Sequence, residues 1–164
     1  MKLPNWIIEW LSWSANEVVR KRPVHDFTVG GSDNPYMYRW WVIPRNKVFN
    51  IYLHRFLRSD SDEALHDHPW AFNISIIVKG EYTEHTKLAG GVERKRLFPT
   101  GTIKLRLGPA PHRVELTAGE VWTFFITGPT IREWGFHCPK GWRPWKEFVA
   151  SHDGGNTVGR GCGD

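Results

Sequence analysis

Two hydrophobic periodicities divide the chain near Pro23. From Pro4 to Arg22 the polar residues recur three and four positions apart, which is the spacing of one stripe along a helix. We expect an amphipathic helix within residues 1–22, packed on the outside of the domain. The stripe consists of Asn5, Glu9, Ser12, Asn16 and Arg20, and the remaining surface carries Trp6, Ile7, Trp10, Leu11, Trp13, Val18 and Val19.

The ends of this helix are also marked. Pro4 suits a first helical position, the basic residues at positions 20–22 complement the helix dipole, and Pro23 stops the helix. A helix that binds a membrane surface or a second copy of the chain is the alternative. We favour packing on the domain, because the basic residues gather at one end and do not line the polar stripe.

After Pro23 the pattern changes to short apolar or alternating runs separated by turn residues, at a spacing of roughly ten residues. This pattern is typical of an antiparallel sandwich or barrel, so the predicted fold class is all-β. The expected strands are 24–29, 36–43, 48–57, 66–78, 81–87, 92–98, 103–107, 112–116, 121–127 and 131–137, and residues 142–149 fit either a short helix or a final strand.

The domain organisation follows from these runs. Residues 1–22 form the helix and residues 23–150 a single barrel. Residues 151–164 are rich in glycine and too poor in apolar residues to order themselves, so they are predicted to be a flexible tail.

Composition narrows the class of protein. Ten Trp and nine Phe indicate an aromatic-rich core or cavity. The net charge of +5 is spread along the sequence, whereas nucleic-acid binding requires a focused basic patch. No apolar run approaches the roughly 20 residues of a membrane span, and Glu9 interrupts the segment that a secretory signal would need. The cysteines Cys138 and Cys162, the second in the glycine-rich tail, are expected to be reduced thiols of a cytoplasmic protein.

The candidate chemistry starts from two histidines, His66 and His68, at the entrance of a buried run. In a strand, residues i and i+2 point to the same face, so both imidazoles can reach one point. Neutral imidazole is the commonest protein ligand for metals. By the same parity Trp70 and Phe72 would wall the cavity and shield a metal from bulk water. The alternative is a pair of surface histidines beside a turn.

The spacing of His66-x-His68, Asn73 and Gly80 resembles the first motif of the cupin superfamily. That resemblance implies a cupin double-stranded β-helix, or jelly-roll barrel. The Leu65-His66-Asp67-His68-Pro69-Trp70 segment is similar to a group of small, mostly uncharacterised cupin-like proteins of bacteria and phages, which implies a fold but no reaction. Asn73 stands where cupins that bind manganese or iron usually carry Glu.

His112 is the expected third metal ligand. It follows a Gly-Pro-Ala-Pro turn and opens an alternating strand in which Val114 and Leu116 share its face. The resemblance implies a histidine at this place in the second cupin motif, although Leu107 and Pro109 stand in place of the usual Pro-x-Gly. The alternative is a histidine that caps a loop.

Further residues are candidates for the same site. Glu84 could supply a carboxylate to the site, and His54 could act as an acid or base. Asn73 and Trp70 are expected to contact the substrate, and Arg132 to hold an anion near the barrel mouth. Asp67 lies between the two histidines in the sequence and should point away from them, into a turn or salt bridge.

These residues support three hypotheses for the function. The first is a metal-dependent cupin that acts on a small molecule, such as a dioxygenase-like iron enzyme or an isomerase, with Fe(II) favoured over zinc, manganese or nickel. The second is a non-catalytic cupin that binds a sugar or an anionic metabolite. The third is a structural or interaction protein with a vestigial site, which would use the Trp-rich helix to form a homodimer.

Overall fold

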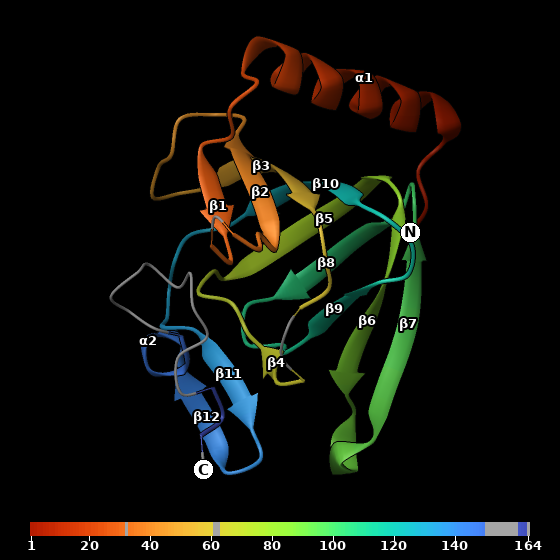
Figure 1. The fold of residues 1–164 in the computed structure, drawn as a ribbon. Helices are drawn as coiled ribbons and strands as arrows, with labels where there is room; N and C mark the ends of the chain where they lie inside the picture. The colour runs from red at the N-terminus through yellow and green to blue at the C-terminus, as the bar shows by residue number, and fades with distance from the viewer. Residues whose placement is uncertain (32, 61–62, 150–160, 164) are drawn as a thin grey trace.

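The computed structural model describes residues 1–31, 33–60, 63–149 and 161–163. The chain forms an N-terminal helix followed by strands, with one short helical turn near the end (Figure 1). In order, the elements are α1 (Asn5–Lys21), β1 (Phe27–Val29), β2 (Met37–Trp41), β3 (Asn50–Phe56), β4 (Leu65–His66), β5 (Phe72–Lys79), β6 (Glu81–Lys87), a 3-10 turn (Ala89–Gly91), β7 (Glu93–Pro99), β8 (Ile103–Leu107), β9 (Arg113–Leu116), β10 (Val121–Thr127), β11 (Gly135–Cys138), β12 (Gly141–Pro144) and α2 (Trp145–Phe148).

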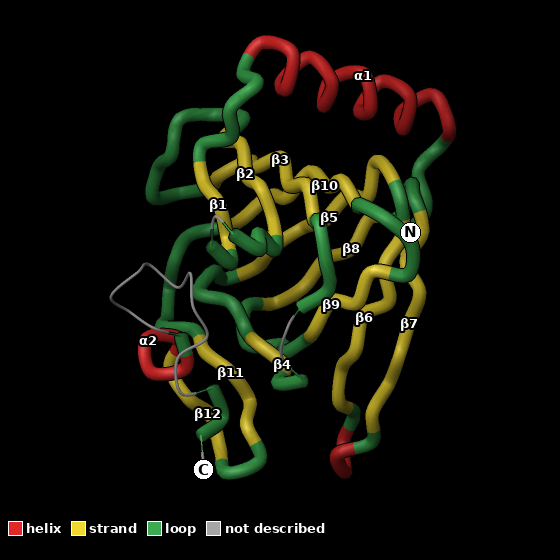
Figure 2. The backbone as a smooth tube through the Cα atoms, in the orientation of Figure 1, coloured by secondary structure: helices red, strands yellow, loops and turns green. Residues whose placement is uncertain are grey.

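The strands form three antiparallel sheets. The largest has the order β1-β2-β3-β10-β5-β8, and the two smaller ones have the orders β7-β6-β9 and β12-β11-β4. One apolar cluster joins Met37, Phe56, Ile77 and Val121 of the large sheet to Tyr82, Phe98 and Val114 of the β7-β6-β9 sheet. The two sheets therefore pack face to face around a common interior (Figure 2), and the prediction of an all-β barrel is confirmed.

The inward side chains of the large sheet lie in cross-strand rows, and the rows change from apolar to polar along the barrel. The first row holds Met37, Phe56 and Val121. The next row holds Arg39, His54 and Thr123, and the one after it Tyr52, Phe125, Ser75 and Lys104. The last row is entirely polar. It consists of Asn50, Thr127, Asn73 and Arg106. An apolar core thus closes one end of the barrel, and the other end is polar.

Helix α1 lies along the outer side of the large sheet (Figure 1). Its only fully buried residue, Ala15, packs in a cluster with Trp40, Leu53, Val78 and Phe124. The Ser12 hydroxyl, expected on the polar stripe, instead turns inward and donates a hydrogen bond to the Val78 carbonyl.

The exposed face of α1 differs from the expected one. Trp6, Trp10 and Trp13 are 70%, 60% and 61% exposed. A small residue at position 15, flanked by Leu11, Val18 and Val19, lets the helix approach the sheet closely, so this narrower stripe forms the contact and the large tryptophans face solvent. The expectation that the apolar side as a whole packs on the domain was therefore wrong for the three tryptophans.

The histidine segment is not the single strand predicted for residues 66–78. Strand β4 ends at His66 and β5 begins at Phe72, with Pro69 in the break. Proline has no N–H to donate to a neighbouring strand. The alternation restarts in β5, so Asn73, Ser75 and Ile77 point inward, and Phe72 points to the outer face with Ile74 and Ile76. Phe72 therefore does not wall the cavity.

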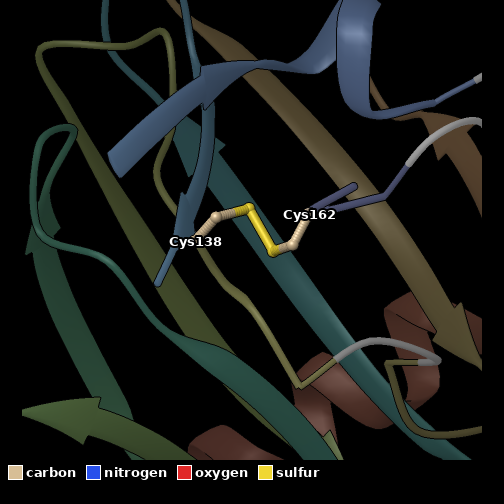
Figure 3. Close-up of a disulfide and its surroundings, with 2 residues drawn as sticks. All are labelled: Cys138 and Cys162. Atoms are coloured by element: carbon tan, nitrogen blue, oxygen red, sulfur yellow. A yellow bond between two sulfur atoms is a disulfide. The ribbon is translucent and has the colours of Figure 1, made fainter. Parts of the chain in front are cut away.

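The C-terminal part holds a second correction. Residues 142–149 form both of the alternatives, the end of strand β12 and then helix α2. Most of the predicted tail, 151–160 and 164, lies outside the described residues, but Cys162 forms a disulfide with Cys138 (Figure 3). The prediction of reduced thiols was wrong, because the sequence did not reveal that the Gly161 amide bonds back to the Phe148 carbonyl and brings Cys162 to β11. The cytoplasmic location loses the support that free thiols gave it.

No described helix combines the length and the apolar composition that crossing a bilayer requires.

Candidate metal centre

Backbone pairing places His66 and His112 opposite each other. The two residues form an isolated antiparallel bridge, in which each amide donates to the other residue's carbonyl at 2.9 Å. Residues paired in this way are neighbours across the strands, and the two imidazole centroids lie 4.7 Å apart. The expected link between the two halves of the site is therefore made by the main chain.

His68 is fixed by the turn that precedes His112. Its amide donates to the Gly108 carbonyl at 2.9 Å. A Cβ at position 108 would lie 1.9 Å from the Trp70 carbonyl oxygen, so only glycine allows this approach of the two segments. The Gly-Pro-Ala-Pro turn thus holds His68 beside His112, with their Nε2 atoms 2.8 Å apart.

The three imidazoles form a cluster of the size that one metal ion requires. His66, His68 and His112 each offer a ring nitrogen within 4.8 Å of the others. Nitrogen ligands at about 2.1 Å from a common ion are roughly 3.0–3.4 Å apart, so small movements of these side chains would complete a three-histidine site. The residues present therefore fit a divalent metal ion.

The protonation state also suits a metal. Burial is the main cause that lowers the pKa of His66, and it holds the pKa values of His68 and His112 well below their usual range. All three imidazoles are consequently neutral at pH 7, with a lone pair available on each ring. Neutral imidazole is the form that ligates metals.

A buried carboxylate orients one of the ligands. Glu84 on β6 accepts a hydrogen bond from His112 Nδ1 at 3.0 Å, which leaves Nε2 facing the cluster. A carboxylate behind a ligating histidine is a recurrent feature of metal sites. On the first ligand, Asp60 Oδ2 lies 3.8 Å from His66 Nδ1 and also accepts a hydrogen bond from the Val114 amide.

Glu84 is itself held by two basic side chains. Lys104 and Arg106, neighbours on the inward face of β8, both contact its carboxylate. The three side chains line a cavity of about 380 Å³ that also extends to Arg96 and Phe98 of β7. The carboxylate therefore lies between this cavity and His112. Glu84, which was predicted to supply a carboxylate to the site, stands behind a candidate ligand and outside the group of three imidazoles.

Asp67 has the structural position that the sequence predicted. Its side chain is 1% exposed and points away from the cluster. It accepts hydrogen bonds from the amide of Gly135 and the side chains of His137 and Trp142, and it forms an ion pair with Arg132 at 3.0 Å. Asp67 thus connects the histidine segment to β11 and β12 through hydrogen bonds. Arg132 forms its ion pair with Asp67 and not with the histidine cluster.

The other predicted site residues surround the cluster at different distances. The Trp70 ring stacks on His68 with centroids 5.4 Å apart. Asn73 is buried, and its Nδ2 has no hydrogen-bond partner among the described residues. His54 lies two rows deeper than Asn73, with its ring 5.0 Å from Phe125, and Phe125 is 6.2 Å from His68.

Sequence reasoning missed four residues of this region: Arg39, Asp60, Lys104 and Arg106. Alternation in 103–107 was a usable signal for the two on β8, because the apolar residues Ile103, Leu105 and Leu107 occupy the outward positions and force the charged ones inward. Nothing in the sequence placed Arg39 or Asp60 near the histidines.

A scan against protein-family models and a search of curated proteins found no match to this chain. Solved structures do match. Fe(II) HppE in complex with its substrate is 13% identical with a TM-score of 0.50, covering 62% of this chain and 54% of that chain. A double-stranded β-helix protein from Klebsiella pneumoniae is 14% identical (TM-score 0.49, 66% and 90% covered), and a cupin superfamily protein from Desulfitobacterium hafniense is 13% identical (TM-score 0.46, 57% and 77% covered).

The class of the fold rests on the strands and sheets of this chain itself. The chain has a mostly β fold with an N-terminal helix, and its structural neighbours are cupin superfamily and double-stranded β-helix proteins. The chain spans about half the length of the HppE chain that it matches. At this level of identity the likeness describes the fold, and the site must be argued from its own residues.

Proposed function

We propose that this protein is a metal-dependent cupin in which His66, His68 and His112 bind one divalent ion next to a small-molecule site. The observation that carries the proposal is the gathering of three neutral imidazoles within 4.8 Å, from segments joined by main-chain hydrogen bonds. Fe(II) is the first ion to test, with zinc, manganese and nickel as alternatives; HppE, one of the structural neighbours, is an Fe(II) protein.

The charge of the site favours an anionic small molecule. Three neutral imidazoles leave the double charge of the ion uncompensated, and Asn73 offers no carboxylate. Of the nearest acids, Glu84 is engaged by Lys104 and Arg106 and Asp67 by Arg132, and Asp60 beside His66 offers one negative charge against the two of the ion. A ligand with a negative group would balance this excess of positive charge.

In this proposal each residue has a stated role. A bound divalent ion would supply Lewis-acid or redox chemistry at its open positions. Glu84 keeps the His112 proton on Nδ1, and Trp70 and Phe125 exclude water from the side of His68. His54, neutral because burial holds its pKa well below the usual range, could donate its Nδ1 proton to the small molecule, and Asn73 could bond the small molecule through its unpartnered Nδ2.

Specific observations favour two alternatives. The absence of a carboxylate at position 73 favours a cupin that binds a sugar or anionic metabolite without turnover. The three exposed tryptophans of α1 favour an interaction protein, for example a homodimer formed through this helix.

Metal analysis tests the proposal. Protein purified without chelator and reconstituted with Fe(II) under anaerobic conditions should hold about one ion per chain, and the His66→Ala/His68→Ala double variant should hold none. His25→Ala is a matched control, because His25 stacks on Tyr38 away from the cluster. Equal metal content in the double variant and the wild type would refute the ligand assignment.

A further inference from the structure

Arg39 is a cation of the barrel interior for which the described residues provide no counter-charge. It lies on β2 in the polar row with His54 and Thr123. Its Nε donates to His54 Nε2 at 2.9 Å, and its guanidinium stands 4.9 Å from the centre of the Tyr52 ring. Among the described residues no carboxylate pairs with it. The inward basic residues Lys104 and Arg106, by contrast, share Glu84.

The charge of Arg39 persists despite its surroundings. Burial lowers its pKa to about 10, so the guanidinium stays protonated at neutral pH. A partly buried charge without an opposite charge destabilises a fold, and such positions are commonly completed by a ligand. Arg39 is half-buried as a residue, so the protein does not seal it off completely from solvent.

The polar groups around Arg39 all offer hydrogen-bond donors. Because Arg39 Nε must donate to His54 Nε2, the neutral His54 ring carries its proton on Nδ1, and this buried Nδ1 has no partner among the described residues. Two more buried groups have no hydrogen-bond partner among the described residues. They are the Thr123 hydroxyl, in the same row as Arg39, and the Asn73 amide nitrogen, in the polar row towards the metal centre. A ligand that suits this set must bring acceptors.

We propose that Arg39 and His54 bind an oxyanion group, a carboxylate or a phosphate, of the small molecule that is bound at the metal centre. This inference rests on the proposed function, because it assigns a recognition site to the same ligand. A guanidinium offers a planar pair of donors that matches either oxyanion. The ring of Phe125 lies 5.0 Å from the His54 ring and 6.2 Å from the His68 ring, so the Arg39–His54 pair is one side chain away from the histidine cluster.

Arg39 suits this role better than the arginine that sequence reasoning selected. Arg132 is paired with Asp67 at 3.0 Å, and its Nη1 also approaches the His68 carbonyl at 3.4 Å. An anion at Arg132 would compete with a buried carboxylate. An anion at Arg39 would compete with no carboxylate of the described residues.

The test measures the binding of inorganic phosphate and of malonate to the whole chain by titration calorimetry. Arg39→Gln removes the charge but keeps an amide that can donate to His54, and it should weaken the oxyanion that fits by about 10- to 100-fold. Arg45→Gln is the matched control, because Arg45 is an exposed arginine over the Trp41 ring and its loss changes the net charge equally. We expect less than about a twofold effect from it in 0.15 M salt.

A further variant separates the contribution of Arg39 to anion binding from that of the metal. In His68→Ala protein, which should lack metal, Arg39-dependent binding of phosphate or malonate is expected to persist, so a failed metal site does not hide a correct Arg39 site. If neither anion binds the wild type, if Arg39→Gln binds like the wild type, or if Arg45→Gln loses as much, the Arg39 proposal is overturned. A preference for malonate or for phosphate identifies which oxyanion the ligand carries.

A second measurement covers the case in which Arg39→Gln does not fold. Wild-type protein is treated with phenylglyoxal, which modifies arginine, and the peptides are mapped by mass spectrometry. The better-binding oxyanion should protect Arg39 and leave the modification of Arg45 unchanged. Equal modification of Arg39 with and without the anion would contradict the proposal.

Discussion

At the scale of single residues, the cluster depends on groups behind the imidazoles as well as on the imidazoles themselves. His112 has its tautomer set by Glu84, and Glu84 is in turn fixed by Lys104 and Arg106. The sequence identified the three histidines through their strand parity and motif spacing. It could not show which atom of Glu84 meets which histidine, because that contact joins strands β6 and β9 through a register that only the folded barrel defines.

Replacing Glu84 tests this orientation. Glu84→Gln should weaken metal affinity by about 10- to 100-fold without abolishing it, because the ligands remain but His112 loses its charged acceptor. Competition with a fluorescent chelator measures the change. Glu133→Gln, at an exposed carboxylate beside Lys146, should leave the affinity unaltered. If Glu84→Gln binds the metal as tightly as the wild type, Glu84 does not position the ligand.

The buried histidines also predict how the metal-free protein responds to pH. Burial lowers the pKa values of His54, His66, His68 and His112 below the unfolded value of 6.5. On acidification below pH 6.5 the unfolded chain therefore binds protons that the folded chain does not, and stability should fall by up to about 1.4 kcal/mol per pH unit for each histidine.

Chelator-treated protein melted between pH 6.5 and pH 5 measures this effect; Lys104, whose pKa burial lowers to about 6, adds to the loss of stability mainly above pH 6. Carboxylates contribute little in that window, because the shifted ones, Glu17, Glu93, Glu115 and Glu120, have pKa values lowered below 4.5. A melting temperature that is level or rises from pH 6.5 to pH 5 would contradict the lowered histidine pKa values.

At the scale of elements, the helix and most strands were predictable, but their faces were not always so. The spacing of polar residues in 1–22 predicted α1, and alternation predicted strands such as β8 and β10. The buried face of α1 was misjudged because helical spacing shows only which residues share a side of the helix. The shape of the sheet decides which side is buried, and Ala15, not a tryptophan, packs against the sheet. The break at Pro69 likewise reversed the expected side of Phe72.

Two substitutions in α1 check which face is packed. Ala15→Leu adds volume to the closed contact with the sheet and should destabilise the protein by about 1–3 kcal/mol. Trp10→Gln changes an exposed side chain and should alter stability by less than about 0.5 kcal/mol. Urea denaturation measures both. A larger loss for Trp10→Gln than for Ala15→Leu would mean that the tryptophan face is the buried one.

At the scale of the whole molecule, the barrel joins an apolar end to a polar end that carries the histidines, and a disulfide secures its C-terminal part. Composition and turn spacing predicted one all-β domain with an aromatic interior. They did not predict the disulfide, because the pairing of Cys138 with Cys162 depends on how the chain returns to β11.

The disulfide should contribute to global stability. It closes a loop across a sequence separation of 24, for which chain entropy gives a stabilisation of about 3 kcal/mol. Reduction with dithiothreitol should therefore lower the denaturation midpoint of the wild type. The Cys138→Ser/Cys162→Ser variant should start at the lower midpoint and show no response to the reductant. An unchanged wild-type midpoint after complete reduction would show that the bond adds no stability.

The central claim is that three imidazoles of this barrel bind one metal ion, and X-ray absorption spectroscopy of the Fe(II)-reconstituted protein tests it most directly. The account predicts one iron per chain with a first shell that includes three imidazole nitrogens at about 2.0–2.2 Å, and the loss of one of them in His112→Ala. No bound iron, or an iron whose imidazole shell is the same in His112→Ala as in the wild type, would contradict the account.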